Sequence, residues 1–393
     1  MTMSPSATKP AIPIAPILSS ASFRRAGFAP TATVLDAGEA RLVTSGRIAI
    51  GLALREIGVG SGDTVLVPAY HSQSMVPPVL WRGATPLFYR IRPDTAPDLI
   101  DLARHIDGRT RAVMVTHYFG FIHDLGPLRA LCDARGIALI EDCAHAFIGE
   151  REGRPVGSSG DYAIASSMKF FPIYEGGALV SARRPLDKVA LRSAGPGFEA
   201  KVALTSLENS FSWRRLKGVQ AAMWLPLKLK DGVWGALKKR RSAPAALAPS
   251  SSDSSYSFDP AWLDKRSSWF ARTLLALVPA ARIAGLRRRH YARLDAALGS
   301  LRGVRALYPG LPPGVCPWVY PLLVTDPEPL FDRLLAAGVP VVRFGHPLWQ
   351  GVDEHTCSVS ADLSRRVLAL PCHQELREDE LAWLIDSVRK AAA

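Results

Sequence analysis

Residues 140–180 read IEDCAHAFIGEREGRPVGSSGDYAIASSMKFFPIYEGGALV and contain two apolar runs separated by a glycine-rich turn. An apolar run leads into two acids, Glu141 and Asp142, as at the carboxyl end of a buried strand. After a glycine-rich turn, a second apolar run over 162–165 leads toward Lys169. Because open α/β sheets bind ligands at the carboxyl ends of their strands, we expect a carboxylate and an amine to meet at one ligand.

The sequence upstream of this stretch alternates short apolar runs with segments of helical spacing. This alternation predicts βαβ units around a mostly parallel sheet, and therefore an α/β fold. The expected strands lie at 64–67, 86–91, 112–115 and 138–140, and the expected helices at 74–82, 99–105 and 125–135.

A further helix is predicted at 48–57, directly after the small-residue turn Thr44-Ser45-Gly46-Arg47. Its apolar residues recur at helical spacing. A turn of this kind presents free backbone N–H groups at the start of a helix, and such groups suit a phosphate. A plain helix cap by Thr44 or Ser45 is the alternative interpretation.

Several motifs, in their order and spacing, resemble the DegT/DnrJ/EryC1/StrS family of sugar aminotransferases, which are pyridoxal-phosphate enzymes of fold type I. The family's E-D-x-A-[HQ]-A strand end corresponds to 141–146, its G-x-x-G-D segment to 157–161, and its serine-to-lysine segment with a [DE]-G-G turn to 166–177. A looser L-P-x-H-x-x-L segment lies at 370–376. The resemblance implies a large domain with a mostly parallel central sheet and a small C-terminal α+β domain.

The resemblance also implies roles for three side chains. Lys169 is expected to form the Schiff base with pyridoxal 5'-phosphate and, once freed by an amino donor, to move the α-proton. Asp142 is expected beside the ring nitrogen, where its carboxylate favours the protonated pyridinium. His145 is expected to face the 3-oxygen of the cofactor. A lysine near an aspartate is, taken alone, usually a surface ion pair, but the surrounding motifs favour the enzyme.

The phosphate of the cofactor is expected to contact two segments of the chain. The step from Asp161 to Lys169 is about two residues shorter than in many family members, so Ser166 is the expected phosphate-binding serine and Ser167 its substitute. The residues expected to hold the phosphate are Ser166, Ser45, Gly46 and Arg47.

The resemblance further implies side chains that border the ring and the substrate. Tyr70 or His71, which follow the strand at 64–67, would stack on the pyridine ring, and the sequence does not choose between them. Asn209, the only asparagine in the chain, is the candidate to reach the phosphate bound by a neighbouring subunit. The residues expected near the substrate are His117, Tyr118 and His346. A positioning role for the first histidine and a core role for the last are the alternatives.

The chain divides into four predicted parts. Residues 1–33 form an arm that is mobile or draped on a partner. Residues 34–242 form the large cofactor-binding domain, 243–258 a Pro/Ser-rich linker or exposed loop, and 259–393 the small domain. Within the small domain, helical segments reach residue 298, a helix is expected at 330–337, and apolar segments lie at 320–324, 338–342 and 367–371.

The charge of the chain favours anionic partners. Lys and Arg number 48 against 35 Asp and Glu, a net charge of +13 over 393 residues. This excess suits phosphorylated ligands, nucleic acid or a membrane surface. Basic residues cluster at 228–241 and 287–289. Such runs are usually solvated faces; peripheral membrane contact through them is the alternative, and no nucleic-acid partner is expected.

The cysteines and the termini indicate a cytoplasmic protein. Five widely separated cysteines favour neither a disulfide framework nor a metal site. Prolines at positions 10, 13 and 16 interrupt the N-terminal apolar patch, so no signal peptide is expected. The apolar window 269–286 contains two arginines and a proline, so no transmembrane helix is expected.

The resemblance implies an aminotransferase that moves an amino group, with glutamate as the expected donor, to a keto-sugar nucleotide in polysaccharide or glycosylated-metabolite biosynthesis. The presence of Lys169 favours transamination over the dehydration carried out by family members with histidine there. A homodimer follows from the resemblance. The alternatives are an aminotransferase for a non-sugar keto substrate and a non-catalytic relative that is regulatory or surface-associated.

Overall fold

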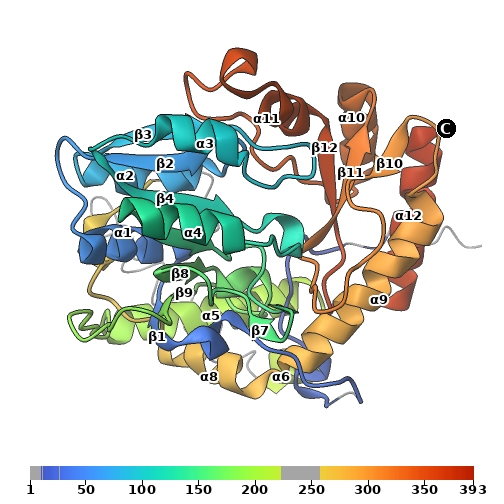
Figure 1. Ribbon diagram of the computed structural model, residues 1–393. Coiled ribbons are helices and arrows are strands. Elements are labelled where there is room, and N and C mark those ends of the chain that lie inside the picture. The colour runs from blue at the N-terminus through green and yellow to red at the C-terminus, as the bar shows by residue number, and fades with distance from the viewer. Residues whose placement is uncertain (1–9, 11, 26, 223–256) are drawn as a thin grey trace, which may run out of the picture.

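A seven-stranded sheet forms the centre of the computed structural model, which describes residues 10, 12–25, 27–222 and 257–393 (Figure 1). The strand order is β1-β9-β8-β5-β4-β2-β3. Strands β3, β2, β4, β5 and β8 run parallel, whereas β9 is antiparallel to both β8 and β1. The strands span Glu39–Val43 (β1), Thr64–Pro68 (β2), Thr85–Tyr89 (β3), Thr110–Thr116 (β4), Ala138–Asp142 (β5), Tyr162–Ala165 (β8) and Gly177–Ser181 (β9). The predicted α/β fold with a mostly parallel sheet is confirmed.

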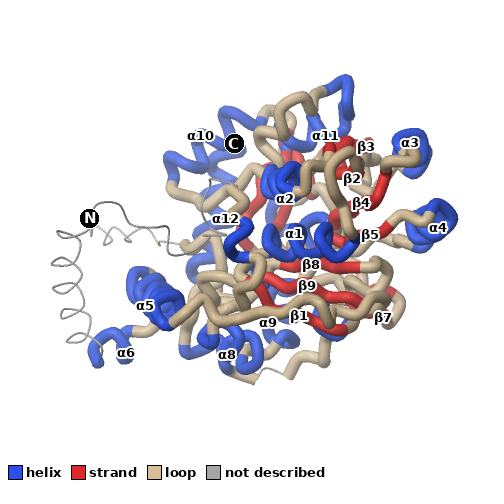
Figure 2. Tube along the Cα trace, turned by 90° about the vertical axis from the view of Figure 1, so that its left-hand side faces the viewer, coloured by secondary structure: helices blue, strands red, loops and turns tan. Residues whose placement is uncertain are grey.

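Helices cover both faces of this sheet (Figure 2). On β4, Met114 packs in the cluster with α1 and α2, whereas Val113 and Val115 pack in the cluster with α3 and α4. Burial on both faces explains why the strands read as continuous apolar runs. The helices of this part span Gly46–Ile57 (α1), Val76–Trp81 (α2), Leu99–His105 (α3), Gly126–Arg135 (α4), Pro196–Ser212 (α5) and Lys217–Ala222 (α6). A short hairpin of β6 (Glu150–Arg151) and β7 (Arg154–Pro155) lies between β5 and β8 in the chain.

The C-terminal part contains a three-stranded antiparallel sheet of order β10-β11-β12, which lies beside the central sheet (Figure 1). Its strands span Val304–Ala306 (β10), Val319–Val324 (β11) and Val367–Pro371 (β12). Its helices span Trp269–Leu277 (α8), Ala280–Leu298 (α9), Pro327–Ala337 (α10), Glu354–Arg366 (α11) and Glu378–Ala392 (α12). The apolar segment 338–342 forms no strand of its own; Val342 alone makes an isolated bridge to Ala369. Pro340 has no N–H to donate to a ladder.

Helices α8 and α9 also pack on the large sheet. Ala271 and Leu274 of α8 and Ile283 of α9 lie in one apolar cluster with Phe147 and Phe170. Among the described helices, none is long and apolar enough by itself to cross a membrane, and only α8 and α9 together, bent by 72°, reach those limits.

The basic run 287–289 is not a solvated face throughout, so this expectation is corrected. Arg287 is fully buried, whereas Arg288 is partly buried and Arg289 exposed. Consecutive helical residues point about 100° apart, so a buried helix hides one residue of such a run and exposes another. The other basic run, 228–241, and nearly all of the linker predicted at 243–258 lie outside the described residues.

The described residues of the N-terminal arm pack on the C-terminal part of the same chain. Ser19 Oγ donates to Glu375 Oε2 at 2.6 Å, and Ser22 Oγ donates to Glu375 Oε1 at 3.2 Å. Pro13 adds a contact of 2.8 Å from its carbonyl oxygen to Nε2 of His373. This part of the arm is therefore attached to its own chain, while the division into four parts stays a prediction.

Candidate active site

Lys169 lies at the end of a 3-10 turn, Ser167–Lys169, which follows β8. The Ser167 N–H donates to the Gly176 carbonyl at 3.1 Å. A Cβ on Gly176, whose φ is +146°, would lie 2.4 Å from Ser167 Oγ, and a Cβ on Gly177 would lie 2.3 Å from the carbonyl carbon of Ser45. The two glycines therefore allow the lysine turn, β9 and the start of α1 to meet.

The amine of Lys169 is partly buried between a carboxylate and an aromatic ring. Its Nζ lies 4.6 Å from the centroid of the Trp318 ring, within cation–π range. Burial lowers the pKa of Lys169 to about 8, and the charge of Asp142 opposes that shift. Burial raises the pKa of Asp142, while the Ala144 N–H, which donates to Oδ1 at 2.9 Å, and the charge of Lys169 lower it. The structure thus brings the predicted amine and carboxylate together.

His145 also contacts Trp318. The two rings stack with centroids 3.9 Å apart. Burial, and then the charge of Lys169, lower the pKa of His145 well below its ordinary value, so the ring is neutral at pH 7. The Phe119 N–H donates to His145 Nδ1 at 3.5 Å, which leaves the ring proton on Nε2. His145 is therefore a neutral donor next to Lys169.

The turn after β4, which carries the H-x-x-G pattern 117–120, sets the position of Trp318. The Trp318 N–H donates to the Phe119 carbonyl at 2.8 Å. Gly120 has φ +103°, and a Cβ there would lie 2.2 Å from the Cys316 carbonyl oxygen. Only glycine permits this approach between the large sheet and the segment before β11 that carries Trp318.

The start of α1 lies against the end of β8. Ser45 caps the helix, because its Oγ accepts from the Ile48 N–H at 3.3 Å. A Cβ on Gly46 would lie 3.7 Å from Ser166 Cβ. Among the described residues, the buried hydroxyls of Thr44 and Ser167 have no hydrogen-bond partner. Two unpartnered hydroxyls beside a helix N-terminus fit a phosphate group. The guanidinium of Arg47 donates to the Ser257 carbonyl.

Tyr70 and His71 have different surroundings. Both ring nitrogens of His71 are engaged, Nδ1 with the Ala69 carbonyl at 2.9 Å and Nε2 with the Trp349 N–H at 3.2 Å. The His71 ring stacks on Phe88. Tyr70 is buried beside the rings of Tyr118 and Phe344, and its hydroxyl has no partner among the described residues. His71 therefore ties β2 to the C-terminal part, and Tyr70 keeps an unused polar group.

The three residues predicted near the substrate also occupy different places. The Tyr118 hydroxyl donates to the Tyr70 carbonyl, and His346 is exposed on the C-terminal part. His117 lies beside Glu141, which alternates with Asp142 along β5 and so points to the other face of the sheet. Asn209 is exposed near the C-terminal end of α5.

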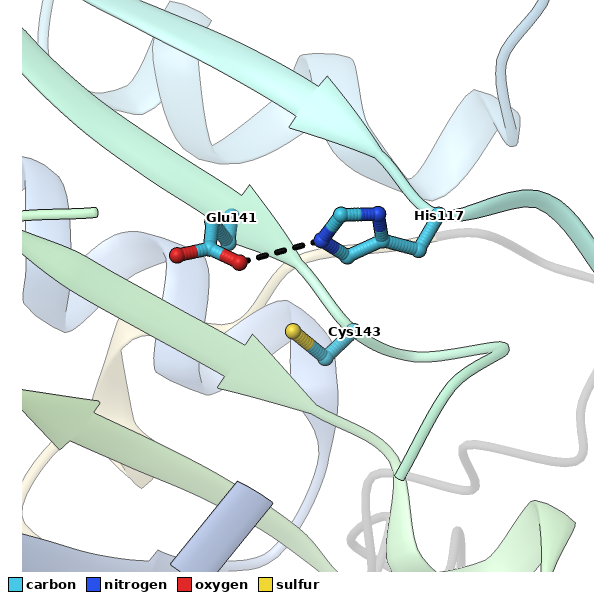
Figure 3. Close-up of side chains that lie close together, drawn as sticks. All are labelled: His117, Glu141 and Cys143. Atoms are coloured by element: carbon cyan, nitrogen blue, oxygen red, sulfur yellow. Dashed lines mark hydrogen bonds and ion pairs between the residues drawn. The ribbon is translucent and has the colours of Figure 1, made fainter. Parts of the chain in front are cut away.

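A buried cluster of His117, Glu141 and Cys143 lies at the ends of β4 and β5 (Figure 3). His117 Nε2 donates to Glu141 Oε2 at 3.0 Å, and its Nδ1 accepts from the His123 N–H at 3.1 Å. Glu141 also accepts from the backbone N–H groups of 157, 159 and 160. Burial raises the pKa of the Cys143 thiol well above its ordinary value. With its nitrogens and oxygens used and its thiol protonated, the cluster is a structural support rather than a metal site.

A cavity of about 330 Å³ adjoins this cluster on the face of the sheet opposite Asp142. Four arginines line it, but acids already neutralise the most buried of them: Arg129 Nη1 lies 2.8 Å from Asp161 Oδ2. Neither Lys169 nor Asp142 lines the cavity, so it is separate from the candidate active site.

Two residues of the candidate site, Trp318 and Thr44, are not predicted from the sequence. Trp318 belongs to the C-terminal part, and no local spacing places it above a lysine 149 positions earlier in the chain. A signal exists for Thr44, which directly precedes the Ser45-Gly46 turn, but a threonine at this position is equally typical of a helix cap.

The sequence of this chain is similar to those of known proteins. The model of the DegT/DnrJ/EryC1/StrS aminotransferase family matches residues 30–245, more than half of the chain. The chain is 36% identical over 172 residues to the GDP-perosamine synthase of Vibrio cholerae, covering 43% of this chain and 47% of that protein. It is 38% identical over 144 residues to the L-glutamine:2-deoxy-scyllo-inosose aminotransferase of Streptomyces kanamyceticus, covering 35% and 33% of the two chains. The matched segment thus spans half or less of these relatives.

Solved structures show the same fold. The aminotransferase TlmJ from Streptoalloteichus hindustanus aligns with a TM-score of 0.63 and 23% identity, covering 90% of this chain and 85% of that one. A DegT DnrJ EryC1 StrS aminotransferase from Brucella abortus aligns with a TM-score of 0.61 and 20% identity, covering 90% and 86%. The predicted fold of a pyridoxal-phosphate transferase is confirmed, and the chain belongs to the DegT/DnrJ/EryC1/StrS aminotransferase family.

Proposed function

We propose that this protein is a pyridoxal-phosphate-dependent aminotransferase whose acceptor is a keto-sugar nucleotide and whose expected donor is glutamate. One observation carries the proposal: the amine of Lys169 has a pKa lowered to about 8 and interacts with the carboxylate of Asp142. A lysine with a lowered pKa beside a single acid suits covalent capture of a carbonyl. The family match supports the same reaction.

The side chains present fit the cofactor. Pyridoxal phosphate supplies, when bound, a carbonyl that captures amines and a ring that withdraws electrons. Lys169 would take a proton from the α-carbon of the donor, since part of its population is neutral near pH 7. Asp142 would hold a proton at the ring nitrogen, and Nε2 of His145 would donate to the 3-oxygen.

The phosphate end would lie at the start of α1. The unpartnered hydroxyls of Thr44 and Ser167 would donate to phosphate oxygens, together with the Ser166 side chain and the first-turn N–H groups of α1. Tyr70 is the better candidate to border the ring, because both nitrogens of His71 are already engaged. Trp318 would shield the amine from water.

Two acceptor classes are supported by the relatives. The GDP-perosamine synthase favours a nucleotide-linked keto-sugar, and the net charge of +13 suits a diphosphate. The 2-deoxy-scyllo-inosose aminotransferase favours a keto-cyclitol without a nucleotide and names L-glutamine as donor. We rank the nucleotide-linked acceptor first. A non-catalytic role is disfavoured because Lys169, Asp142 and His145 are all present.

We further propose a cytoplasmic homodimer that works in polysaccharide or glycosylated-metabolite biosynthesis. The exposed position of Asn209 supports a contact from one subunit to the phosphate site of the other. Peripheral membrane contact through the run 287–289 is disfavoured, because Arg287 is buried.

The proposal is tested by turnover. Purified chain with pyridoxal phosphate is offered glutamate or glutamine and a panel of GDP-, dTDP- and UDP-linked keto-sugars and keto-cyclitols, and amino products are measured by mass spectrometry. We expect product with a nucleotide-linked acceptor, none from Lys169→Ala, and unchanged product from the exposed control Lys188→Ala. Turnover that survives in Lys169→Ala, or no product with any pair, contradicts the proposal.

A further inference from the structure

The C-terminal part holds the backbone of the lysine turn through two buried side chains, Arg287 of α9 and Gln374 after β12. Their exposed fractions are 0% and 2%. Arg287 Nη2 donates to the Lys169 carbonyl at 2.8 Å, and Gln374 Nε2 donates to the Phe170 carbonyl at 2.8 Å. Arg287 Nε donates to Gln374 Oε1 at 2.9 Å. Two consecutive carbonyls are thus held by two side chains that also bind each other.

The same guanidinium holds the backbone of Trp318. Arg287 Nη1 donates to the Trp318 carbonyl at 2.7 Å and to the Pro317 carbonyl at 3.1 Å. Its carbon Cζ lies 4.6 Å from the centroid of the Phe170 ring. The Trp318 ring in turn lies over the amine of Lys169 at 4.6 Å. The guanidinium of Arg287 therefore holds the backbones of both Lys169 and Trp318, whose amine and ring are in contact.

The hydrogen bonds of Arg287 suit a side chain that positions the backbones of Lys169 and Trp318 better than one that stabilises the fold. All its hydrogen-bond acceptors among the described residues are neutral, namely backbone carbonyls and one amide oxygen. A buried charge without a bonded carboxylate costs free energy, so it is weak evidence for a stabilising purpose. A guanidinium offers five N–H groups in one plane, and an ammonium cannot reach the same four acceptors.

We propose that Arg287 and Gln374 are positioning residues for Lys169: by fixing the backbones of 169–170 and of Trp318 together, they keep the amine under the indole ring and away from water. The importance of that placement rests on the proposed function of Lys169, but the placement itself can be measured without cofactor. The titratable groups that act on Lys169 are Asp142 and His145, and neither is changed in the test.

The test measures the pH dependence of acylation of Lys169 in the cofactor-free full chain, with the Lys169 peptide quantified by mass spectrometry. The variants are Gln374→Met, of similar volume but without the two hydrogen bonds, and Arg287→Lys. The control is Arg289→Gln, whose side chain is 56% exposed on the same helix. We expect a midpoint near pH 8 for wild type and control, and midpoints moved toward 10.5 in both variants, because the amine gains water.

Gln374→Met decides the question if Arg287→Lys does not fold. A folded Gln374→Met with an unchanged Lys169 midpoint overturns the proposal, even if its melting temperature falls, because a purely structural role lowers stability without moving the lysine. The proposed function is judged separately. If the midpoints move as expected but the wild type transfers no amino group, the positioning stands and the function fails.

Discussion

Replacing Glu141 by glutamine is expected to lower the free energy of unfolding by about 3–6 kcal/mol. In the native protein the carboxylate accepts four hydrogen bonds, from three backbone N–H groups and from His117 Nε2. A glutamine oxygen can keep two of them, at Oε1, while its NH₂ group would face the N–H of Gly157 and the ring N–H of His117. Each hydrogen bond lost at a charged acceptor costs about 1.5–3 kcal/mol.

Urea unfolding, followed by circular dichroism, measures this loss. The matched control is Glu152→Gln in the nearby hairpin, where the side chain is 79% exposed and the expected change is below about 0.5 kcal/mol. Zinc or a chelator is expected to leave wild-type unfolding unchanged, since the polar atoms of the cluster are already engaged. A loss below about 1 kcal/mol in Glu141→Gln, or stabilisation of the wild type by zinc, would refute the reasoning.

Three further outcomes are expected. Asp142→Asn removes the charge that raises the pKa of Lys169, so the acylation midpoint falls below about 8 and kcat falls by about 100-fold or more; an unmoved midpoint would count against the pairing. Burial raises the pKa of Glu175 to about 7, so the native state binds this proton more tightly than the unfolded chain does. From pH 4.5 to 7 the wild type should lose on the order of 2 kcal/mol of unfolding free energy that Glu175→Gln keeps, and parallel pH curves from urea unfolding would contradict this. Gly177→Ala places a methyl 2.3 Å from the start of α1, so unfolding free energy should fall by about 1–3 kcal/mol and pyridoxal phosphate should bind more weakly in titrations; Gly197→Ala, with no atom within 4 Å, is the control, and equal behaviour of the two would argue against the approach.

The elements closest to local patterns were predictable from the sequence. The helices at 99–105 and 125–135 and the strand at 162–165 lie within one residue of α3, α4 and β8. Apolar runs and turn residues mark such elements locally. The helix expected at 74–82 is divided into a 3-10 turn and α2, because the two prolines near its start remove N–H donors.

The sequence predicts the site residues that lie at the ends of strands. It does not predict those that reach the site from distant segments of the chain. Glu141 and Asp142 are adjacent in sequence, yet alternation along β5 sends them to opposite faces, one to the His117 cluster and one to Lys169. Trp318 and Arg287 reach Lys169 only through packing of the C-terminal part. The charge of Arg287 predicts a solvent-exposed side chain. It is buried instead, because four neutral acceptors take its hydrogen bonds.

We propose that the amine of Lys169 bonds to the carbonyl of pyridoxal phosphate. The most direct measurement treats the full chain with the cofactor and borohydride, then maps the reduced adduct by peptide mass spectrometry. We expect one adduct, on the peptide that contains Lys169, and its loss in Lys169→Ala. An adduct that is absent, or that lies on another lysine at equal yield in both proteins, would contradict it.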